Sequence, residues 1–546
     1  MGSVLLRFLL GVSYPRTINC YPDEWLYLSG AESLWNHHQV MVYNVPSTFA
    51  KVGYPWLIAP AFAIADIKLR GAVIALINSV TVSLGIFPIY GLAKRLLSRE
   101  RHITFCLLLY VISPTMTYSM TYMSEVLYLP VALCLVYLFY RVLTEKNHKK
   151  RVLLGVLMLP ALFLAYVTKS QALAFPVAMV LTLLVLGISA GGMKRWGSVA
   201  ILFAGIAASL ILVKKGFFGI DFESIVGHSD YVIFGIMFFL VITVLAFCVL
   251  PLMIPGMTLK SLSEDARRLY IFLTSLIVVT AGVVAVMIYI VEDYPSLTPR
   301  AHVRYVEFVF VPAVMLLLQV LERQERPAGK VKYLLALGIW AGVTLVFFAG
   351  FSGQTVDQTM LFYWQLIAED GQHFAGTKVR GLSVLIIVVV ALLLMIFEKN
   401  RKVFEKIMVI GLTIMCLGNN ALSVYVQYKT HTHSRQETRE AEEILSFVRE
   451  HSQDNVLVLE PAGNNELLDT FLMDCHNVRT GIEPVVTQVE EKYQMPKDVT
   501  YVLACDQAYT LDENMLSQQS YPRLGYTLFQ LRDKQDASDI VIKSAE

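Results

Sequence analysis

Long apolar runs alternate with short polar loops along the first 427 residues of the chain. A run of roughly 17–25 apolar residues is long enough to cross the hydrocarbon core of a bilayer as a helix. We expect spans near 71–93, 103–121, 124–143, 152–168, 171–190, 197–213, 231–256, 269–291, 305–321, 333–350, 381–397 and 407–427. A shorter run at 3–12 carries Arg7 and is counted as a further span, for about thirteen in all. A signal peptide is the alternative for 3–12, but no small-residue cleavage site follows it.

The composition agrees with this pattern. Hydrophobic residues make up 56% of the 546 positions, charged residues 16%, and the mean hydropathy is +0.57. A soluble protein of this length is far less apolar. The chain is therefore predicted to be a polytopic α-helical membrane protein.

Basic residues gather in every second loop, which predicts the orientation. The basic loops contain Lys94 to Arg101, Arg141 to Arg151, Lys194 and Arg195, Lys260 to Arg268, Arg323 to Lys332, and Lys399 to Lys406. By the positive-inside rule these loops face the cytoplasm, so the N-terminus lies inside and the C-terminus outside a plasma membrane. The net charge of +2 reflects this orientation signal and indicates no nucleic-acid partner. The chain also lacks a P-loop motif, which excludes that kind of cytoplasmic nucleotide site.

After the last apolar run the sequence turns polar and mixed. A helical pattern at 439–450 and strand-like runs at 455–460 and 499–504 predict a small α/β domain outside the cytoplasm. We therefore expect a membrane domain at 1–427 and an extracytoplasmic domain at 428–546. Cys475 and Cys505 lie in this second domain, where a disulfide is permitted, and both a bonded and a free pair stay open.

The first outer loop holds an adjacent acidic pair, Asp23 and Glu24, at the start of a predicted interfacial helix that carries Trp25, Tyr27 and Trp35. Acids at a helix N-terminus are favoured by the helix dipole, which is the ordinary explanation. Paired carboxylates at a cleft also suit a general base with a positioning or metal-binding neighbour. Both interpretations stay open.

Charged residues also stand at the outer ends of later spans. Glu125 begins the span at 124–143, and Lys169 lies between the fifth and sixth spans. Each can reach water at the interface, or can line a water-filled cavity. Arg300 and Arg304 form a basic cluster on the outer side, against the orientation rule, and such cations usually have an anionic partner. A phosphate is a natural partner for arginine.

The order of these motifs carries a family resemblance. Along the chain they are Asp23-Glu24, Tyr54-Pro55-Trp56, Ser113-Pro114, Ser124-Glu125, Lys169, and Arg300 with Arg304-Tyr305. In this the chain resembles the GT-C superfamily of integral membrane glycosyltransferases, in particular bacterial mannosyltransferase-like and aminoarabinose-transferase-like members, loosely over 14–320. The resemblance implies a GT-C-like fold, a first-loop acid that acts on the acceptor, and a sugar that arrives on a polyprenyl phosphate. Two departures are the short first span and Lys169 where an arginine is expected.

The resemblance also implies roles for the site residues. Asp23 would be the general base of an inverting transfer, and Glu24 would orient the acceptor or a metal. The substrate- and phosphate-binding residues would be Tyr54, Lys169, Arg300, His302, Arg304 and Tyr305. A divalent cation, Mg²⁺ or Mn²⁺, held by Glu125 with Asp23 or Glu24, stays an open alternative.

The expected partners are a polyprenyl-phosphate-linked sugar donor, the lipid bilayer, and a lipid or cell-envelope glycan or polymer as acceptor. Two other functions are considered. A transporter or flippase of lipid-linked saccharides would usually carry charges at mid-membrane depth and paired broken helices related by repeats. Here the expected spans are almost free of charge at mid-depth and no two halves look alike, which favours an enzyme. A membrane anchor for an exported binding domain would not need so many spans.

Overall fold

The protein is described here by a computed structural model. The structure describes residues 1–13, 22–39, 41–42, 45–46, 51–189, 229–247, 249–286, 303–323, 338, 376–430, 435–459, 478–481, 493–494, 499–505, 509–510, 515–531 and 541–544. The chain divides into two compact units. Unit 1 contains Met1–Leu5, Asn78–Tyr118 and Glu125–Tyr425, and unit 2 contains Leu6–Ile77, Ser119–Ser124 and Val426–Glu546. The expected division at 427/428 stays a prediction.

Unit 1 is a bundle of helices. Its α-helices include α5 (Ile86–Leu96), α6 (Glu100–Ile112), α7 (Glu125–Thr144), α8 (His148–Thr168), α9 (Ala174–Ser189), α12 (Ser229–Ala246), α13 (Leu250–Met257), α14 (Glu264–Val286), α15 (Phe310–Arg323) and α17 (Gly376–Lys399). Short 3₁₀ turns join them: η2 (Pro114–Met120), η3 (Ser170–Leu173), η4 (Leu259–Ser261), η6 (Val303–Tyr305) and η7 (Glu307–Val309). The helices α4 (Ile67–Ser83) and α18 (Arg401–Thr430) run through the division between the units.

Seven helical segments within the described residues are long and apolar enough to cross a membrane. They agree with the spans expected at 71–93, 103–121, 124–143, 152–168, 171–190, 269–291 and 407–427. The span expected at 197–213 lies outside the described residues, as does the one expected at 333–350 apart from residue 338. These segments indicate a multi-pass membrane protein. The total of about thirteen spans stays a prediction.

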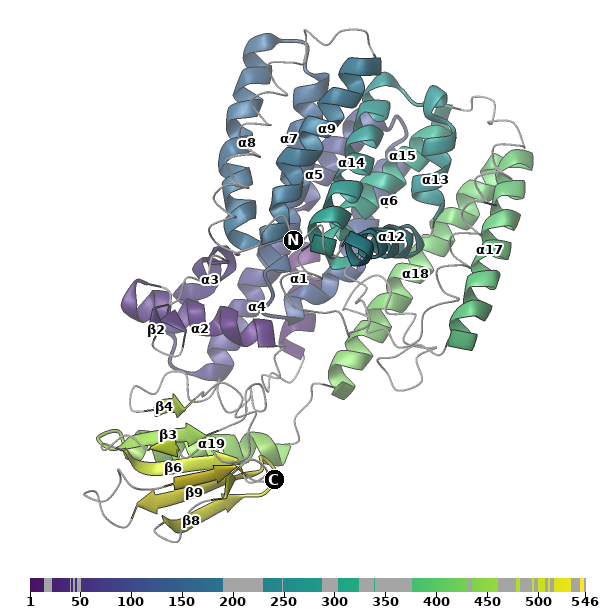
Figure 1. Ribbon diagram of the computed structural model, residues 1–546. Coiled ribbons are helices and arrows are strands. Elements are labelled where there is room, and N and C mark those ends of the chain that lie inside the picture. Colours follow the sequence, from purple (N-terminus) through teal and green to yellow (C-terminus); the bar gives the residue numbers. More distant parts are fainter. Residues whose placement is uncertain are drawn as a thin grey trace. The chain divides into compact units, whose positions relative to one another are not determined.

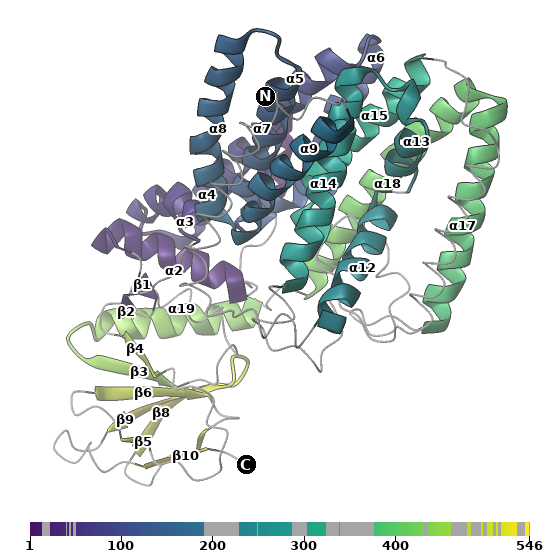
Figure 2. The ribbon, with the colours of Figure 1, turned by 45° about the horizontal axis from the view of Figure 1, so that its top comes forward.

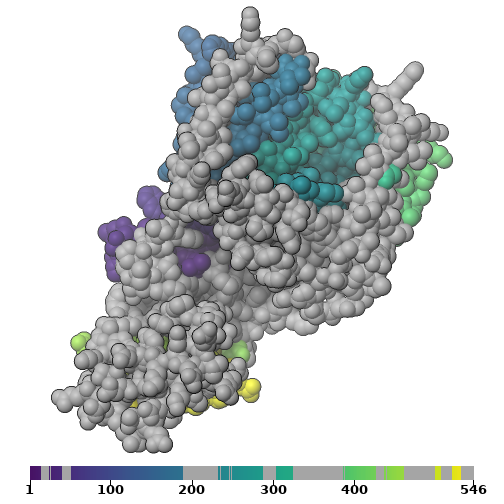
Figure 3. Space-filling view, in the orientation of Figure 1, coloured from purple at the N-terminus to yellow at the C-terminus, as the bar shows by residue number. Residues whose placement is uncertain are grey.

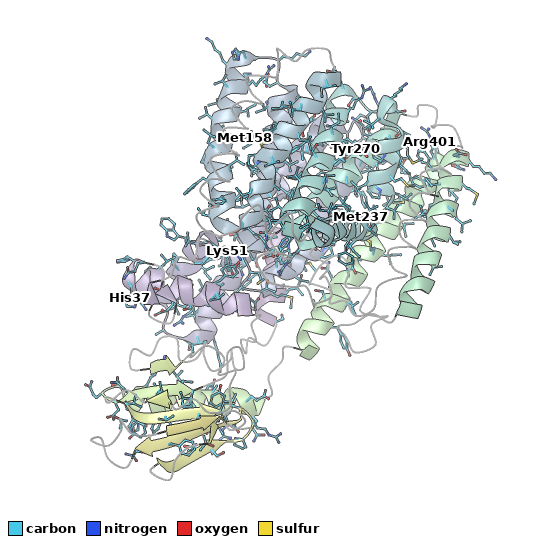
Figure 4. The ribbon with its side chains drawn as sticks, viewed as in Figure 1. His37, Lys51, Met158, Met237, Tyr270 and Arg401 are labelled. Carbon is cyan, nitrogen blue, oxygen red and sulfur yellow. The ribbon has the colours of Figure 1, made fainter. Side chains whose placement is uncertain are left out.

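The helices α7 and α8 lie side by side and show two kinds of apolar helix (Figure 1). Most side chains of α7 are buried against α5, α8 and α14, as expected for a helix that is apolar on all sides. Figure 4 labels Met158, one of the few buried side chains of α8. The outer side of α8 instead exposes Val152, Leu153, Val156, Leu157, Leu159 and Phe163. In a bilayer such a row would face lipid.

The segment expected to form one span at 231–256 is broken. It forms α12 and α13, with Val249 at φ 62° between them. Pro251 has no N–H with which to continue the helix, and the Val249 N–H bonds five residues back to the carbonyl oxygen of Val244 (2.8 Å). In Figure 3 the teal atoms at the surface of this unit belong to residues between 229 and 323.

A charged network joins α6, α15 and α18 at one end of the bundle. Nδ1 of His102 lies 2.7 Å from Glu322 Oε1, and its Nε2 lies 3.0 Å from Glu405 Oε1. The backbone N–H groups of Ser98 and Arg99 donate to Glu322 at 2.7 and 3.0 Å. These contacts connect three helices that are far apart in sequence.

Unit 2 contains both N-terminal and C-terminal elements. The N-terminal ones are α1 (Gly2–Ser13), α2 (Pro22–His37), β1 (Met41–Val42), β2 (Val45–Pro46), α3 (Gly53–Ile58) and η1 (Ala59–Ala63), α1 beginning in unit 1. After α18 come α19 (Arg435–Glu450), β3 (Asn455–Leu459), β4 (Val478–Gly481), β5 (Tyr493–Gln494), β6 (Val499–Cys505), β7 (Tyr509–Thr510), β8 (Met515–Tyr521), β9 (Tyr526–Leu531) and β10 (Val541–Ser544).

A five-stranded sheet in the order β4-β3-β6-β9-β8 carries α19 on one face (Figure 2). The strands β4, β3 and β6 are parallel, and β9 and β8 continue the sheet antiparallel. Ala441, Ile444 and Val448 of α19 pack into one apolar core with Val456 and Leu503. The helix and the two strands agree with the elements expected at 439–450, 455–460 and 499–504.

Candidate active site

Charged and aromatic side chains meet inside unit 1, where the membrane-spanning helices α7 and α8 begin and end. We call this set the buried charge cluster. It consists of Tyr118, Glu125, Lys169, Arg304, Tyr305 and Glu307. The residues come from η2, the N-terminus of α7, the C-terminus of α8, η6 and η7.

Local backbone structure places the two partners of the central ion pair. Glu125 is the first residue of α7, where the helix dipole favours a carboxylate. Lys169 ends α8: its N–H still bonds to the carbonyl oxygen of Ala165 (2.8 Å), but its backbone is extended (φ −154°, ψ 128°). This break directs the chain into η3.

Both cations approach the same carboxylate oxygen. Lys169 Nζ donates a hydrogen bond to Glu125 Oε1, and Arg304 Nε lies 3.4 Å from that oxygen. Glu125 is only 1% exposed and Lys169 only 5%. Charges removed from water in this way are stable only when they are paired, so each partner depends on the others.

Both cations contact the ring of Tyr305. Lys169 Nζ is 4.6 Å from the ring centre, and the guanidinium carbon of Arg304 is 5.3 Å from it. Such cation–π contacts hold the two cations on one aromatic side chain. Together with Glu125, Tyr305 therefore gathers two positive charges at one buried place.

Tyr118 and Glu307 form the other half of the cluster. The Tyr118 hydroxyl donates to Glu307 Oε2 at 2.7 Å, and both residues are buried. Glu307 follows Arg304 by three residues, so this bond also holds the η6–η7 segment that carries Arg304 and Tyr305. Next along η7, Phe308 stacks on Phe175 at 5.6 Å and contacts Tyr128 edge-on at 6.0 Å. These rings give the cluster an apolar wall.

Unit 2 holds a second group of predicted residues. Glu24 is buried and accepts the backbone N–H of Tyr122 at 2.8 Å. One turn further along α2, the Tyr27 hydroxyl donates to Ser124 Oγ at 3.0 Å. Tyr54 is buried and lies edge-on to Tyr27, with ring centres 5.7 Å apart. The same face of α2 therefore holds residues 122–124, through the backbone N–H of Tyr122 and the side chain of Ser124.

The predicted site residues have different outcomes. Lys169, Arg304, Tyr305 and Glu125 come together in the buried charge cluster. Glu24 and Tyr54 belong to unit 2. Arg300 and His302 lie outside the described residues, as does Cys475. Asp23 belongs to α2, but its side chain is outside the described part of the structure.

Sequence reasoning missed Glu307 and the bonding roles of Tyr118 and Tyr27. Glu307 falls inside the span expected at 305–321. A carboxylate within an apolar span is costly and usually functional, so this position alone was a usable signal. The partners of Tyr118 and Tyr27 depend on tertiary contacts, which no local motif announces.

The described carboxylates do not form a metal site as they stand. Among the described residues no group of three or more His, Cys, Asp or Glu side chains is placed to hold an ion. Two cations flank Glu125, and Glu24 accepts a backbone N–H. The expected cation also depends on Asp23, whose side chain is not described, and so it stays a prediction.

Residues 51–214 match the family described as dolichyl-phosphate-mannose-protein mannosyltransferase. The fold is similar to two crystal structures of ArnT from Cupriavidus metallidurans, one bound to undecaprenyl phosphate and one in the apo state. The TM-scores are 0.51 and 0.52, and the sequence identity is 12% in both cases. Each alignment covers 97% of this chain and 96% of the ArnT chain. No curated protein matches the chain. The resemblance to the GT-C superfamily of membrane glycosyltransferases is thereby confirmed.

Proposed function

We propose that this protein is an inverting glycosyltransferase that moves a sugar from a polyprenyl-phosphate donor to a lipid or cell-envelope glycan acceptor at the outer face of the plasma membrane. One observation carries the proposal: Lys169 and Arg304 converge on a single buried carboxylate oxygen. Two cations held together beside an apolar wall can bind the phosphate of a lipid carrier. The ArnT structure bound to undecaprenyl phosphate supports this class of donor.

In this proposal Asp23 is the general base. It takes the proton of the acceptor hydroxyl as the hydroxyl oxygen attacks the anomeric carbon. The bond between the anomeric carbon and the phosphate oxygen breaks, and the lipid phosphate leaves with the electron pair. Lys169 and Arg304 stabilise the charge that develops on this leaving group. Arg300 and His302 are further donors to the phosphate in the proposal.

Tyr305 keeps the cations together, and Glu24 with Tyr27 holds the chain just before Glu125. Tyr54, packed on Tyr27, supports that arrangement. The alternating basic loops support a cytoplasmic N-terminus. With that orientation α19 and its sheet lie outside the cytoplasm, where we propose that they contact the acceptor.

The test is sugar release from radiolabelled polyprenyl-phosphate sugars by the purified protein in nanodiscs, beside Asp23→Asn. We expect one donor to be turned over with acceptor-containing membrane extract, and Asp23→Asn to lose that activity. Asp66→Asn is the matched control, because Asp66 caps the N-terminus of α4 through the Leu69 N–H (2.7 Å) and asparagine caps equally well. Full activity of Asp23→Asn would refute the base assignment. Transport of a donor without release of its sugar would favour a flippase.

A further inference from the structure

The anion site proposed for the lipid phosphate already contains an anion, the side chain of Glu125. Its Oε1 accepts from Lys169 and faces Arg304 Nε at 3.4 Å. These are the two cations that the proposed function assigns to the leaving phosphate. The carboxylate also stands at the N-terminus of α7, a place that favours negative charge.

The charges of the cluster are balanced without any ligand. Glu125 and Glu307 supply two negative charges, and Lys169 and Arg304 supply two positive ones. All but Arg304 are almost completely buried. A phosphate added beside both acids would bring an excess negative charge to these four described side chains, in surroundings of low dielectric constant, which is unfavourable.

We infer that Glu125 is an internal competitor for the phosphate site, and that the lipid phosphate binds by displacing its carboxylate from Lys169 and Arg304. This inference rests on the proposed function. When the sugar has been transferred, the carboxylate returns to the cations and promotes release of the lipid phosphate product. Glu125 thereby sets how long the product stays bound.

The energetics of such an exchange are those of a two-state equilibrium. The phosphate binds only the fraction of molecules in which Glu125 has left, so its apparent affinity is reduced by that fraction. Between turnovers the Glu125 carboxylate pairs with the two cations and so compensates for the water that they have lost. It also avoids leaving Lys169, which is almost completely buried, without the carboxylate that it pairs with.

The test is the affinity of the full-length protein in nanodiscs for sugar-free undecaprenyl phosphate. Glu125→Gln removes the competing charge at nearly constant size, and we expect its dissociation constant to fall by about tenfold. Its kcat should fall with slower product release, while inhibition by added undecaprenyl phosphate becomes stronger. Glu145→Gln is the matched control. Glu145 follows the other end of α7 and pairs with Arg141 at 3.1 Å, so no change is expected.

Glu125→Gln leaves two buried cations without their partner, so stability is measured as well. We expect a lower Tm without ligand and a larger rise in Tm with undecaprenyl phosphate than in the wild type. If Glu125→Gln does not fold, Glu125→Asp, which withdraws the carboxylate by one methylene, should still bind the lipid more tightly than the wild type.

The outcomes separate the inference from the proposed function. Suppose that the wild type binds the lipid and that Lys169→Met abolishes this binding. If both Glu125 variants then bind the lipid no more tightly than the wild type, the inference is overturned and the proposed function is not. Absence of lipid binding in the wild type would overturn both.

Discussion

Tyr118 donates a 2.7 Å hydrogen bond to Glu307, and both side chains are buried where η2 meets η7. The bond joins residues 189 positions apart. Since Glu307 shares its segment with Arg304 and Tyr305, this contact fixes the part of the chain that brings a cation to Glu125.

Tyr118→Phe therefore removes the donor and leaves a buried carboxylate. We expect a loss of about 1–3 kcal/mol in the free energy of unfolding, measured as a lower Tm. Tyr90→Phe, at a half-exposed position of α5, should change the Tm little. In a double-mutant cycle, Glu307→Gln should cost less in the Tyr118→Phe background than in the wild type. Additive effects of the two substitutions would contradict a direct interaction.

Lys169→Met tests the central ion pair. Breaking a buried pair leaves Glu125 without its nearest cation, and we expect destabilisation of about 3–5 kcal/mol together with loss of lipid phosphate binding. Lys68→Met is the control, because Lys68 is 82% exposed in its pair with Glu442, and such pairs contribute about 0–1 kcal/mol.

The double variant Lys169→Met/Glu125→Gln separates stability from function. With both charges removed, much of the stability should return, as seen by Tm. Binding of undecaprenyl phosphate should stay weak, because a cation is still missing. Recovery of binding in the double variant would show that Lys169 does not hold the phosphate.

The sequence predicts the helices of unit 1 well, because each apolar run must be buried in lipid or protein over its whole length. The start of α7 at Glu125 follows from the polar residues before it. The break at Val249 was missed because the run 231–256 stays apolar through it. Pro251 marks the break, but hydropathy alone does not register a missing N–H donor.

The site is only partly visible in the sequence. Lys169, Arg304 and Tyr305 stand out as polar residues at span ends, and they do meet. Their meeting point, Glu125 Oε1, could not be derived, because hydrophobic periodicity says which face of a helix is buried and not what lies against it. The expected role of Glu24, to orient an acceptor or a metal, stays a prediction, and the bond that Glu24 accepts from the Tyr122 N–H could not be derived from the sequence.

Acid pH should weaken the network at Glu322, which follows the apolar part of α15. Burial raises the pKa of this carboxyl, but hydrogen bonds from Ser98, Arg99 and His102 outweigh it and hold the pKa below its usual range. The ionised form is therefore favoured by folding. Its contribution to stability is complete above the unfolded pKa of about 4.3 and is lost as the pH falls through the lower folded value.

We therefore expect the difference in Tm between wild type and Glu322→Gln to be largest near pH 6 and to shrink as the pH falls below about 4.3, the unfolded pKa, and through the lower folded pKa. Glu450→Gln, at an exposed position at the end of α19, also removes one carboxylate, and it controls for the change of net charge. A difference that is constant across this range would mean that ionisation of Glu322 does not stabilise the fold.

Glu24→Ala tests whether α2 holds the chain at residues 122–124. The variant removes the acceptor of the Tyr122 N–H, a bond to a charged group of about 1.5–3 kcal/mol, so amide exchange there should rise by about ten- to a hundredfold. Hydrogen exchange followed by mass spectrometry of peptides covering 119–124 measures this.

Glu24→Gln retains an acceptor oxygen and should have a smaller effect. Glu32→Ala, on the same helix, removes a contact with Asn36 and should leave these peptides unchanged. Equal exchange in Glu24→Ala and the wild type would mean that Glu24 does not hold this segment.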